Sequence, residues 1–594
     1  MLFIIAVEIL AVKLRNSRDI KGIAIRRTKK CIKLKQYADD TTLVLRNFES
    51  ITCALKCIKE FGEVSGLKLN KAKTEGILLG SLADQNHPNM EIKFTSDPVR
   101  CLGIFIGCNK SECDLKNWMD KIQFFEQTLD RWKQRNLTLF GRILILKILG
   151  LSKFVYLFSV LYVPEDIRKT LKTIMYKFLW NGRESVKRKT MSCAYEQGGL
   201  QMIDLDVFIM SLNAAYAARL ITNEGCENIF IEFYAAELGC SLQQLFHCYI
   251  TKSKYDKNIS DVFPEFYQNV IYAYNECRFF KKATLMNPYD FLSQTIWHNE
   301  FLMWKSNALD FKNWIDAGIV FVCDLFHDNG TFLSGEDVYR KLRVKTNWIA
   351  QYATVKKVIV PKLVESGIDS SYARHINTNN IKVDMLNTEK GLIPLCGKKS
   401  KFFYDIIIRK HVETPTAQCY WERSLNVQKS KWKDIYINKI VLIKDKKIAE
   451  FNFKLLHRIL PCRYYLHKWN PRITETCPFC GQIESIEHLV FFCNRIQAIW
   501  NVVGNALNCK IRIKHILFGF PYADIAVVEY CISIIAYFIY KTWLLFNLEY
   551  NDDGYKNCNL MAKIKNELTW KIEILKQTKY KDVIKSLSKI YEKL

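Results

Sequence analysis

Apolar and polar positions change their period along the chain, and this change separates an early mixed part from a later helical part. Residues 1–15 have the three-to-four-residue spacing of an amphipathic helix. Residues 31–36 and 41–46 instead alternate apolar and polar side chains, which predicts two strands joined as a hairpin. From about residue 112 onward the spacing is dominantly helical.

The segment after the hairpin combines another helix with further extended chain. Apolar side chains recur at helical spacing between residues 51 and 61, with Ser50 as the expected cap and Gly66 as the expected end. A second extended pair is expected near residues 76–80 and 101–107. The predicted fold class is therefore α+β, with a mainly α-helical remainder.

Length, charge and cysteine usage narrow the class of protein. The chain has 594 residues, too many for one ordinary core, which indicates several packed units. Its 87 Lys and Arg against 60 Asp and Glu give a formal net charge of +27. This excess favours polyanions such as RNA and DNA, although a protein that is basic only for solubility would share it. The 21 scattered cysteines do not suggest a disulfide framework and favour an intracellular location, in the nucleus, the cytoplasm or both.

Two apolar segments could be mistaken for a signal peptide or a membrane span. The first ten residues lack a basic start and contain Glu8, so we do not interpret them as a signal peptide. Residues 525–547 are very apolar, but Glu529 and Lys541 interrupt the run. A buried helix fits this pattern better than a membrane span, and we expect no membrane anchor.

Asp39 and Asp40 stand at the expected tip of the hairpin. Adjacent carboxylates at an exposed edge suit Mg²⁺, which takes oxygen ligands and shares them with substrate phosphates. In nucleotidyl transfer, two such ions about 4 Å apart hold the attacking and leaving oxygens. An Asp-Asp turn taken alone is more often only a polar turn, so its flanks decide the interpretation.

A second candidate site lies far downstream. Cys477 and Cys480 form a Cys-x₂-Cys pair, His488 follows after seven residues, and Cys493 after four more. Three thiolates and one imidazole complete a tetrahedral Zn²⁺ site with no open position, which predicts a structural site. The alternative is four unrelated residues in a cysteine-rich chain.

Four segments, in order, resemble motifs of non-long-terminal-repeat (long interspersed element) retrotransposon reverse transcriptases. Tyr37-Ala-Asp-Asp40 resembles the Tyr-x-Asp-Asp motif, and residues 2–11 resemble the helix that follows the template-contacting segment. Residues 66–74 resemble the next motif, and residues 101–107 resemble the hairpin that grips the primer. The resemblance implies a partial polymerase palm, an antiparallel sheet with helices, at the start of the chain.

The resemblance also implies roles for single residues. Asp39 and Asp40 would be catalytic ligands of Mg²⁺, and Lys73 would assist the pyrophosphate leaving group as a general acid. The family needs a third carboxylate from an earlier strand, whereas only Glu8 and Asp19 precede the pair here. We therefore expect the catalytic set to be incomplete and the chain alone not to extend a primer.

Residues 121–190 form a basic stretch with 15 Lys and Arg against 5 Asp and Glu. Cations interleaved with aromatics suit base stacking and phosphate contact, yet their spacing fits a solvated helix face equally well. The segment 137–147 resembles the thumb of the same family, and Gly198-Gly-Leu200 follows where that family has it. This resemblance favours binding of primer and template. The candidate nucleic-acid-binding residues are Arg131, Trp132, Lys133, Arg135, Arg142 and Lys147.

The Cys-His cluster resembles the zinc-binding region of these polymerases, which binds nucleic acid. His457 and His467 lie nearby without ligand spacing and are interpreted as surface or packing residues. The predicted domains are a partial palm at 1–110, a thumb-like basic helical domain at 111–190, a helical connecting region at 191–445, a zinc-binding region at 446–505 and a C-terminal helical region at 506–594.

Three functions follow from the resemblance. The leading hypothesis is a carboxy-terminal fragment of an RNA-directed DNA polymerase that binds RNA and DNA, holds structural Zn²⁺ and is inactive alone. The second is a reverse transcriptase that works, with Mg²⁺, when joined to a part supplying the missing carboxylate. The third is a domesticated, non-enzymatic RNA- or DNA-binding protein.

Overall fold

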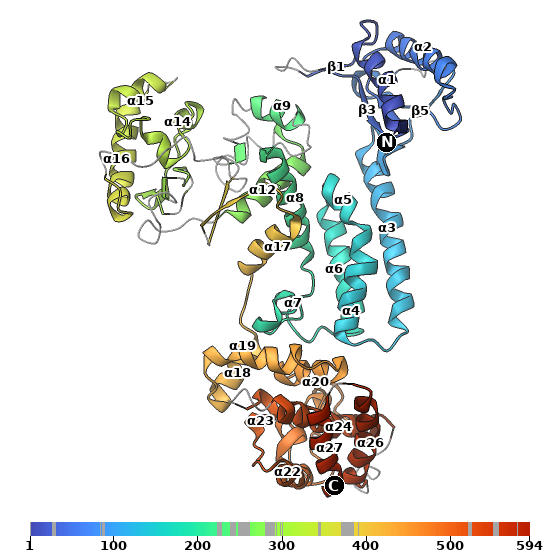
Figure 1. Cartoon of the computed structure of the whole chain (residues 1–594), viewed down its shortest axis with the longest axis vertical. Coiled ribbons are helices and arrows are strands. Elements are labelled where there is room, and N and C mark those ends of the chain that lie inside the picture. The colour runs from blue at the N-terminus through green and yellow to red at the C-terminus, as the bar shows by residue number, and fades with distance from the viewer. Residues whose placement is uncertain are drawn as a thin grey trace. The chain divides into compact units, whose positions relative to one another are not determined.

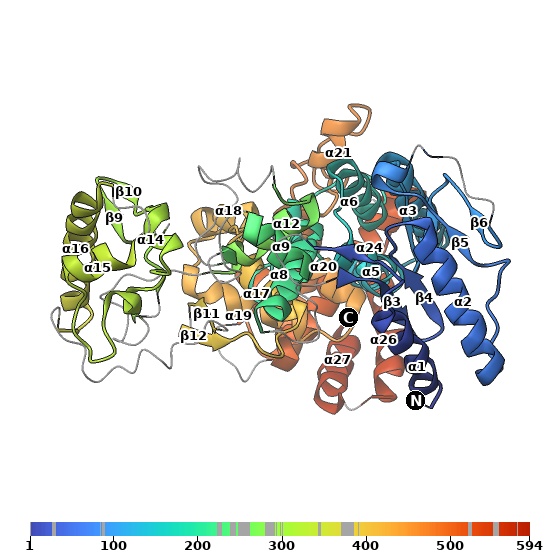
Figure 2. The ribbon, with the colours of Figure 1, turned by 90° about the horizontal axis from the view of Figure 1, so that it is seen from above.

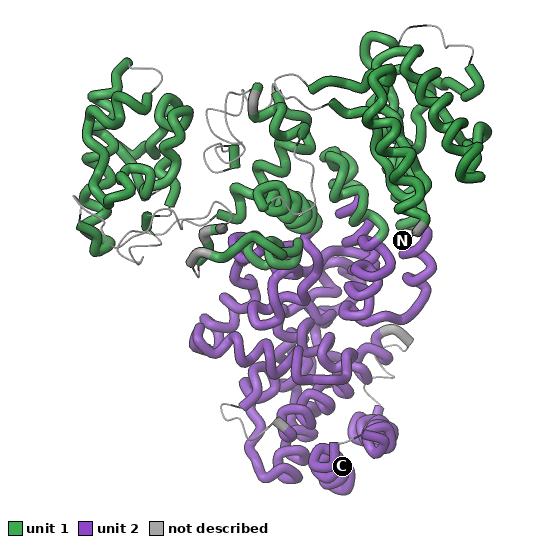
Figure 3. Tube along the Cα trace, turned by 45° about the horizontal axis from the view of Figure 1, so that its top comes forward, with its two compact units in different colours: residues 1–126, 153–170, 205–407 green, residues 127–152, 171–204, 408–594 purple. Residues whose placement is uncertain are grey.

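The computed structural model of the chain has two compact units (Figure 3). Unit 1 comprises residues 1–126, 153–170 and 205–407, and unit 2 comprises residues 127–152, 171–204 and 408–594. The structure describes residues 2–25, 31–83, 85, 90–222, 229–237, 245–246, 262–278, 291–292, 294–297, 299, 301–342, 346–369, 385–389, 391–520, 526–549, 558–578 and 580–594. Within these ranges helices predominate, and every strand belongs to a two-stranded pair.

The acidic hairpin lies near the start of unit 1, among the first two helices (Figure 1). Strands β3 (Leu34–Tyr37) and β4 (Asp40–Leu43) pair antiparallel, and Tyr37 opposite Asp40 is the last pair before the turn. Helix α1 (Leu2–Asn16) packs against α2 (Phe48–Ser65) and β3. Their shared core consists of Leu10, Ala11, Leu14, Ile20, Leu34 and Ala54. The predicted first helix and the predicted hairpin are thus both present.

Helix α2 confirms one predicted end and corrects the other. Gly66 ends the helix in the left-handed conformation, with φ of 74°, as glycine at this position allows. The N-cap, however, is Asn47 rather than Ser50, because the Asn47 side chain accepts a hydrogen bond from the Ser50 backbone N–H. Ser50 is buried in the first turn, where its hydroxyl oxygen accepts a hydrogen bond from the Lys21 N–H.

The predicted second extended pair is wrong in its partners. Strand β5 (Glu75–Gly76) pairs in parallel with β6 (Lys93–Phe94). Residues 101–107 contribute instead to their own hairpin, formed by β7 (Val99–Cys101) and β8 (Ile104–Ile106). Such short strands carry too little alternation to reveal their partners in the sequence. A further short pair joins β1 (Ile23–Ala24) to β2 (Cys31–Ile32).

The helices of unit 1 pack on aromatic side chains. Trp118 and Phe125 of α3 (Lys110–Lys133) contact Phe158 and Phe154 at ring-centroid distances of 6.1 and 5.5 Å. The accompanying helices are α5 (Val155–Val160), α6 (Glu165–Trp180), α8 (Leu205–Thr222), α9 (Ile229–Glu237), α12 (Glu265–Cys277) and α17 (Ser400–Arg409). Helices α3, α6 and α17 contribute residues to both units. The helical character predicted beyond residue 112 is confirmed over the described part of the chain.

A small bundle within unit 1 gathers α14 (Lys312–Asp316), α15 (Gly335–Lys341) and α16 (Trp348–Glu365), as Figure 2 shows. Its core contains the fully buried Trp297 and Trp314. Its short elements are η6 (Val322–Leu325), β9 (Met303–Trp304) and β10 (Asn307–Ala308). The hairpin of β11 (Met385–Thr388) and β12 (Gly391–Pro394) follows later in the sequence.

Unit 2 is built around α24 (Ala526–Glu549), whose side chains are largely buried. This helix packs against α20 (Lys446–Leu456), α23 (Ile513–Phe518), α26 (Leu560–Lys576) and α27 (Lys581–Lys593). Within the part of the chain that the structure describes, two helical segments are long and apolar enough to cross a membrane, 205–222 in unit 1 and 527–547 here. The second is 72% buried within the protein and serves as a core helix, as predicted.

The other helices of unit 2 surround this core or extend from it. They are α4 (Leu139–Ile145), η2 (Leu146–Gly150), α7 (Arg188–Ser192), η4 (Tyr195–Gln197), α18 (Thr416–Leu425), α19 (Trp432–Tyr436), η9 (Ile437–Val441), α21 (Arg463–Trp469), η10 (His488–Phe492) and α22 (Asn494–Leu507). The Cys-His cluster lies between α21 and α22 in the sequence.

Candidate metal centre and nucleic-acid interface

The four predicted zinc ligands come together in unit 2. One ligand atom from each of Cys477, Cys480, His488 and Cys493 lies within 4.8 Å of all the others. Cys480 Sγ and His488 Nε2 are 3.3 Å apart. Three of the four side chains are buried, and Cys480 is half-buried. The described part of the chain contains no other group of three or more His, Cys, Asp or Glu side chains that meets this distance.

The first two ligands sit on a tight turn that the sequence specifies locally. The Cys477 carbonyl accepts a hydrogen bond from the Gly481 N–H, and the Cys477 N–H donates to the Gln482 carbonyl. Gly481 has φ of 74°, a conformation that favours glycine. A bridge between Thr476 and Ile483 closes the base of the turn. Both thiols therefore face one point.

The last two ligands are joined by a single wide helical turn. Segment η10 is a π-helix, and the Cys493 N–H donates to the His488 carbonyl five residues earlier. A five-residue turn places the side chains at its two ends on one side, which an ordinary helical turn would not. The Trp500 indole N–H donates to the Val490 carbonyl and holds the turn against α22.

The cluster fits structural zinc. Zinc with thiolate and imidazole ligands is tetrahedral, and a Zn–S bond of about 2.3 Å places ligand atoms about 3.8 Å apart. The observed separations are compatible with that geometry after slight closure. Four protein ligands leave no position for a reacting water, so the ion would hold the fold together rather than perform chemistry.

A buried polar network joins this cluster to the core of unit 2. Glu484, 1% exposed, accepts hydrogen bonds from the Trp543 indole N–H at 2.9 Å and the Arg463 backbone N–H at 3.1 Å. Burial raises the pKa of the Glu484 carboxyl, against the opposing effect of these donors and of the Arg463 charge. Sequence reasoning missed all three residues, because nothing in the sequence links a lone glutamate to a tryptophan 59 residues later.

His457 is a packing residue, as predicted. Its Nε2–H donates to the Gly198 carbonyl at 2.7 Å, and its ring packs 4.3 Å from that of Phe453. Burial lowers the pKa of His457 to about 4. Gly198 has φ of 83°, and a Cβ there would lie 2.7 Å from the Tyr436 ring. Two motifs 259 residues apart in the sequence thus meet in unit 2. His467 lies outside the metal cluster, and its ring bonds the Ile473 carbonyl.

The acidic tip has a different character. Ala38 and Asp39 form the turn, with Ala38 at φ of 54°, and the side chains of Tyr37, Asp39 and Asp40 are exposed. Neither aspartate carboxylate has a hydrogen bond or ion pair with any described residue. No third carboxylate joins them among the described residues. Glu8 lies in α1 and forms an ion pair with Arg15.

Lys73, the predicted general acid, lies in a turn after α2. Its backbone N–H donates to Asn70, while its exposed side chain makes no contact with Asp39 or Asp40 that the described residues record. The hairpin of β7 and β8 contacts the acidic hairpin, because Cys101 Sγ lies 3.3 Å from the Thr42 hydroxyl in β4. The structure therefore brings the two hairpins together, and the role of Lys73 stays a prediction.

The predicted nucleic-acid-binding residues, all in unit 2, fall into two groups. Arg131, Lys133 and Arg135 are exposed and pair with no described carboxylate, and the Arg135 guanidinium stacks 4.9 Å from the Trp132 ring. Arg142 instead donates to the Leu179 carbonyl at 2.9 Å and so binds the end of α6. Burial lowers the pKa of the Arg142 guanidinium.

Lys147 belongs with the second group. It lies on η2, it is half-buried, and burial lowers its pKa. The exposed group therefore presents its charge to solvent more fully than Arg142 and Lys147 do.

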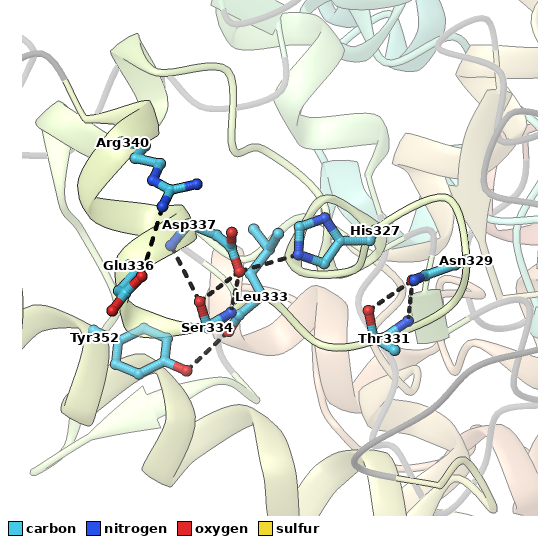
Figure 4. A network of polar contacts seen from close by, with 9 residues as sticks. All are labelled: His327, Asn329, Thr331, Leu333, Ser334, Glu336, Asp337, Arg340 and Tyr352. Carbon is cyan, nitrogen blue, oxygen red and sulfur yellow. Dashed lines mark hydrogen bonds and ion pairs between the residues drawn. The ribbon is translucent and has the colours of Figure 1, made fainter.

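A polar network at the start of α15 contains the residue types of a hydrolytic triad (Figure 4). Asp337 accepts hydrogen bonds from the Ser334 hydroxyl and backbone N–H, and His327 Nε2 lies 3.0 Å from the same carboxylate oxygen. These contacts, chiefly those from Ser334, lower the pKa of Asp337 to about 2. Because the serine bonds the carboxylate and not the imidazole, this network caps a helix and has no nucleophile–base pair.

Comparison with known proteins identifies the region of the chain that contains the Cys₃His cluster. Residues 399–500 match the family described as zinc-binding in reverse transcriptase. The match contains all four candidate ligands, which supports the Cys₃His cluster as a structural zinc site.

A relative extends the similarity beyond this region. The chain is 20% identical over 555 residues to the protein called Transposon TX1 uncharacterized 149 kDa protein of Xenopus laevis. This alignment covers 84% of the chain and 40% of the relative, so the chain spans less than half of the relative's length. The resemblance found in the sequence is confirmed in two respects: residues 399–500 are similar to the zinc-binding region of reverse transcriptases, and most of the chain is similar to a transposon protein.

Proposed function

We propose that the chain is the nucleic-acid-binding portion of a retrotransposon RNA-directed DNA polymerase. The carrying observation is the Cys₃His cluster inside a region that matches the zinc-binding part of reverse transcriptases. The charge of +27 supports a polyanionic partner. The primer–template would contact the thumb-like segment, with residues 1–110 as a partial palm.

The exposed cations around Trp132 supply the first test of binding. We expect Arg131→Glu with Arg135→Glu to weaken binding of primed RNA and to flatten its dependence on salt, because phosphate contacts release counterions. The matched control is Arg142→Gln, which removes a cation already bound to carbonyls and should change the stability more than the salt slope. Unaltered affinity in the double variant would count against the thumb assignment.

Polymerase chemistry is proposed to be incomplete in this chain. Asp39 and Asp40 have the exposure and the free oxygen atoms that Mg²⁺ needs, yet the described residues provide no third carboxylate beside them. We expect the purified chain with Mg²⁺ not to extend a primer on an RNA template. Extension that Asp39→Ala abolishes would refute this part and favour a complete enzyme.

A reading as a non-enzymatic, domesticated binding protein shares the same zinc and binding properties. It differs in predicting no gain of activity when a palm strand carrying the third carboxylate is supplied as a separate polypeptide.

We place the protein inside the cell, in the nucleus or cytoplasm, which the lack of disulfides among the described cysteines supports.

A further inference from the structure

An open groove of about 790 Å³ lies beside the zinc cluster in unit 2. One wall is formed by α18 and α21, and the other includes Ile483, Ser485, Glu487 and Phe492. This second wall belongs to the segment between the ligands Cys480 and Cys493, so zinc binding would fix its position. The volume lies within the range of about 300–1,000 Å³ that is typical of ligand sites.

Aromatic side chains dominate the groove and several of them face solvent. Tyr420, Tyr464, Tyr465 and Phe492 all line it. Tyr420 is 44% exposed and Phe492 is 47% exposed, so both rings present part of their surface to solvent in the groove. Exposed rings in a groove are the surfaces on which unpaired bases stack.

Tyr420 is held in place for stacking. The Arg458 guanidinium lies 3.4 Å from the centroid of the Tyr420 ring, and it forms an ion pair with Glu487 at 3.1 Å. The Tyr420 hydroxyl donates to the same carboxylate at 3.3 Å. Arginine below the ring and glutamate at its edge fix its orientation, so little side-chain entropy would be lost on binding.

The rim of the groove carries positive charge. A second hollow of about 320 Å³ adjoins the groove along α18, shares Tyr420 with it and is lined by Arg423. Arg423 is exposed and pairs with no described carboxylate. On the other side, Lys468 is exposed and donates to the Tyr464 hydroxyl. Cations flank the exposed ring on both helices, which complements phosphates on either side of a stacked base.

We propose that this groove binds an unpaired segment of RNA or DNA, with one base stacked on Tyr420 and neighbouring phosphates at Arg423 and Lys468. The proposal rests on the proposed nucleic-acid-binding function and adds a single-strand site distinct from the cations around Trp132. Base pairs in a duplex are already stacked and cannot enter, so the groove distinguishes single strands from duplexes. A peptide with an aromatic anchor is the competing occupant, and the test separates it.

The experiment measures binding of the full chain to a short single-stranded RNA and to its duplex. Tyr420→Ala should weaken single-strand binding about fivefold or more and leave duplex binding unchanged, since one stacked base contributes about 1–3 kcal/mol. Tyr420→Phe should restore the affinity because it keeps the ring. Trp570→Ala, which removes a 73% exposed ring on α26, is the matched control and should change neither affinity.

Removing charge has a different expected signature. Arg423→Gln should lower the magnitude of the salt slope for single strands by about 0.7, whereas Tyr420→Ala should leave the slope unchanged. Ultraviolet crosslinking of the unmodified chain to 4-thiouridine RNA should mark peptides from α18 or α21. This measurement needs no variant, so it decides the matter even if Tyr420→Ala fails to fold.

The outcomes separate the two proposals. Crosslinks confined to other segments, or single-strand affinity unchanged in Tyr420→Ala with intact zinc, would overturn the groove and leave the proposed function standing. A chain that binds neither RNA form would overturn the proposed function itself. Single-strand binding undiminished by saturation of the groove with a tyrosine-rich peptide would favour the peptide as the occupant and overturn the groove proposal.

Discussion

The Cys₃His cluster in unit 2 and the acidic tip in unit 1 are both turns rich in metal ligands, but the chain completes only one of them. In the cluster, four ligands from 17 consecutive residues meet within 4.8 Å and are largely buried. At the tip, two carboxylates are exposed and have no third carboxylate beside them among the described residues.

This difference is the one expected if the cluster holds zinc and the tip holds Mg²⁺, as proposed above. A structural zinc ion takes its whole coordination shell from one short segment, so its binding energy is folding energy. Mg²⁺ keeps waters and substrate oxygens in its shell, so its protein ligands stay exposed and incomplete until substrate arrives. Removing a candidate zinc ligand should therefore destabilise unit 2. Removing one of the two aspartates should leave the fold of unit 1 nearly unchanged.

The largest expected effect is the loss of zinc. Cys480→Ser should reduce the zinc content from about one ion per chain to nearly none and lower the free energy of unfolding of unit 2 by several kcal/mol. Metal analysis and thermal unfolding would measure both. Cys509→Ser, a half-buried thiol outside the cluster, is the control and should retain zinc. Zinc retained in Cys480→Ser would exclude the assigned ligands.

A smaller effect is expected from acid at His457. The pKa of this imidazole is lowered from 6.5 to about 4, so the folded state holds fewer protons than the unfolded state between these values. The stability contribution is complete above pH 6.5 and decreases as the pH falls, by on the order of 2 kcal/mol between pH 7 and pH 5.

His457→Gln keeps an N–H donor for the Gly198 carbonyl and removes the titration. The difference in unfolding free energy between pH 7 and pH 5 should therefore be smaller in this variant than in the unmodified chain. Acid release of zinc is common to both proteins and cancels in the comparison. Identical pH dependence in the two would show that folding does not lower the pKa of His457.

The anchoring of the zinc cluster to α24 should contribute about 1 kcal/mol. Trp543→Phe removes the indole donor to Glu484 while keeping an aromatic ring in the core. Denaturant unfolding would measure the loss, with the exposed Trp570→Phe as the control. Equal stability in the two variants would mean that the Arg463 N–H alone satisfies Glu484.

The smallest effect is expected at the acidic tip. Asp39→Ala should change the free energy of unfolding by no more than about 0.5 kcal/mol, because the exposed carboxylate has no partner among the described residues. Thermal unfolding with and without Mg²⁺ would measure it. A large destabilisation would show that the tip has a structural role and would remove the contrast with the cluster.

Local patterns in the sequence predicted the zinc cluster, the acidic hairpin and the end of helix α2. Cys477 to Cys493 have the spacing of a zinc site, and the alternation around Asp39 and Asp40 predicted the hairpin. Gly66 was recognised as a helix end because its role depends on its own backbone. In each case the determining residues lie close together in the sequence.

The sequence did not reveal contacts between residues that lie far apart along the chain. The role of Arg142 in nucleic-acid binding stays a prediction, but the sequence did not reveal its hydrogen bond to the Leu179 carbonyl, 37 residues away. The contact of His457 with Gly198 and that of Glu484 with Trp543 cross still greater distances. The Ser50 cap failed for a simpler reason, since Asn47, three residues earlier, is an equally good cap and leaves Ser50 free for the core.

The π-helical turn from His488 to Phe492 limits how this region tolerates changes in its length. Insertion of one residue would place the cysteine six residues after His488 and rotate it by about 100° relative to His488, away from the other ligands. Substitution of the exposed Phe492 would leave the spacing intact. Insertions in this short stretch are therefore expected to be far more damaging than substitutions at its surface.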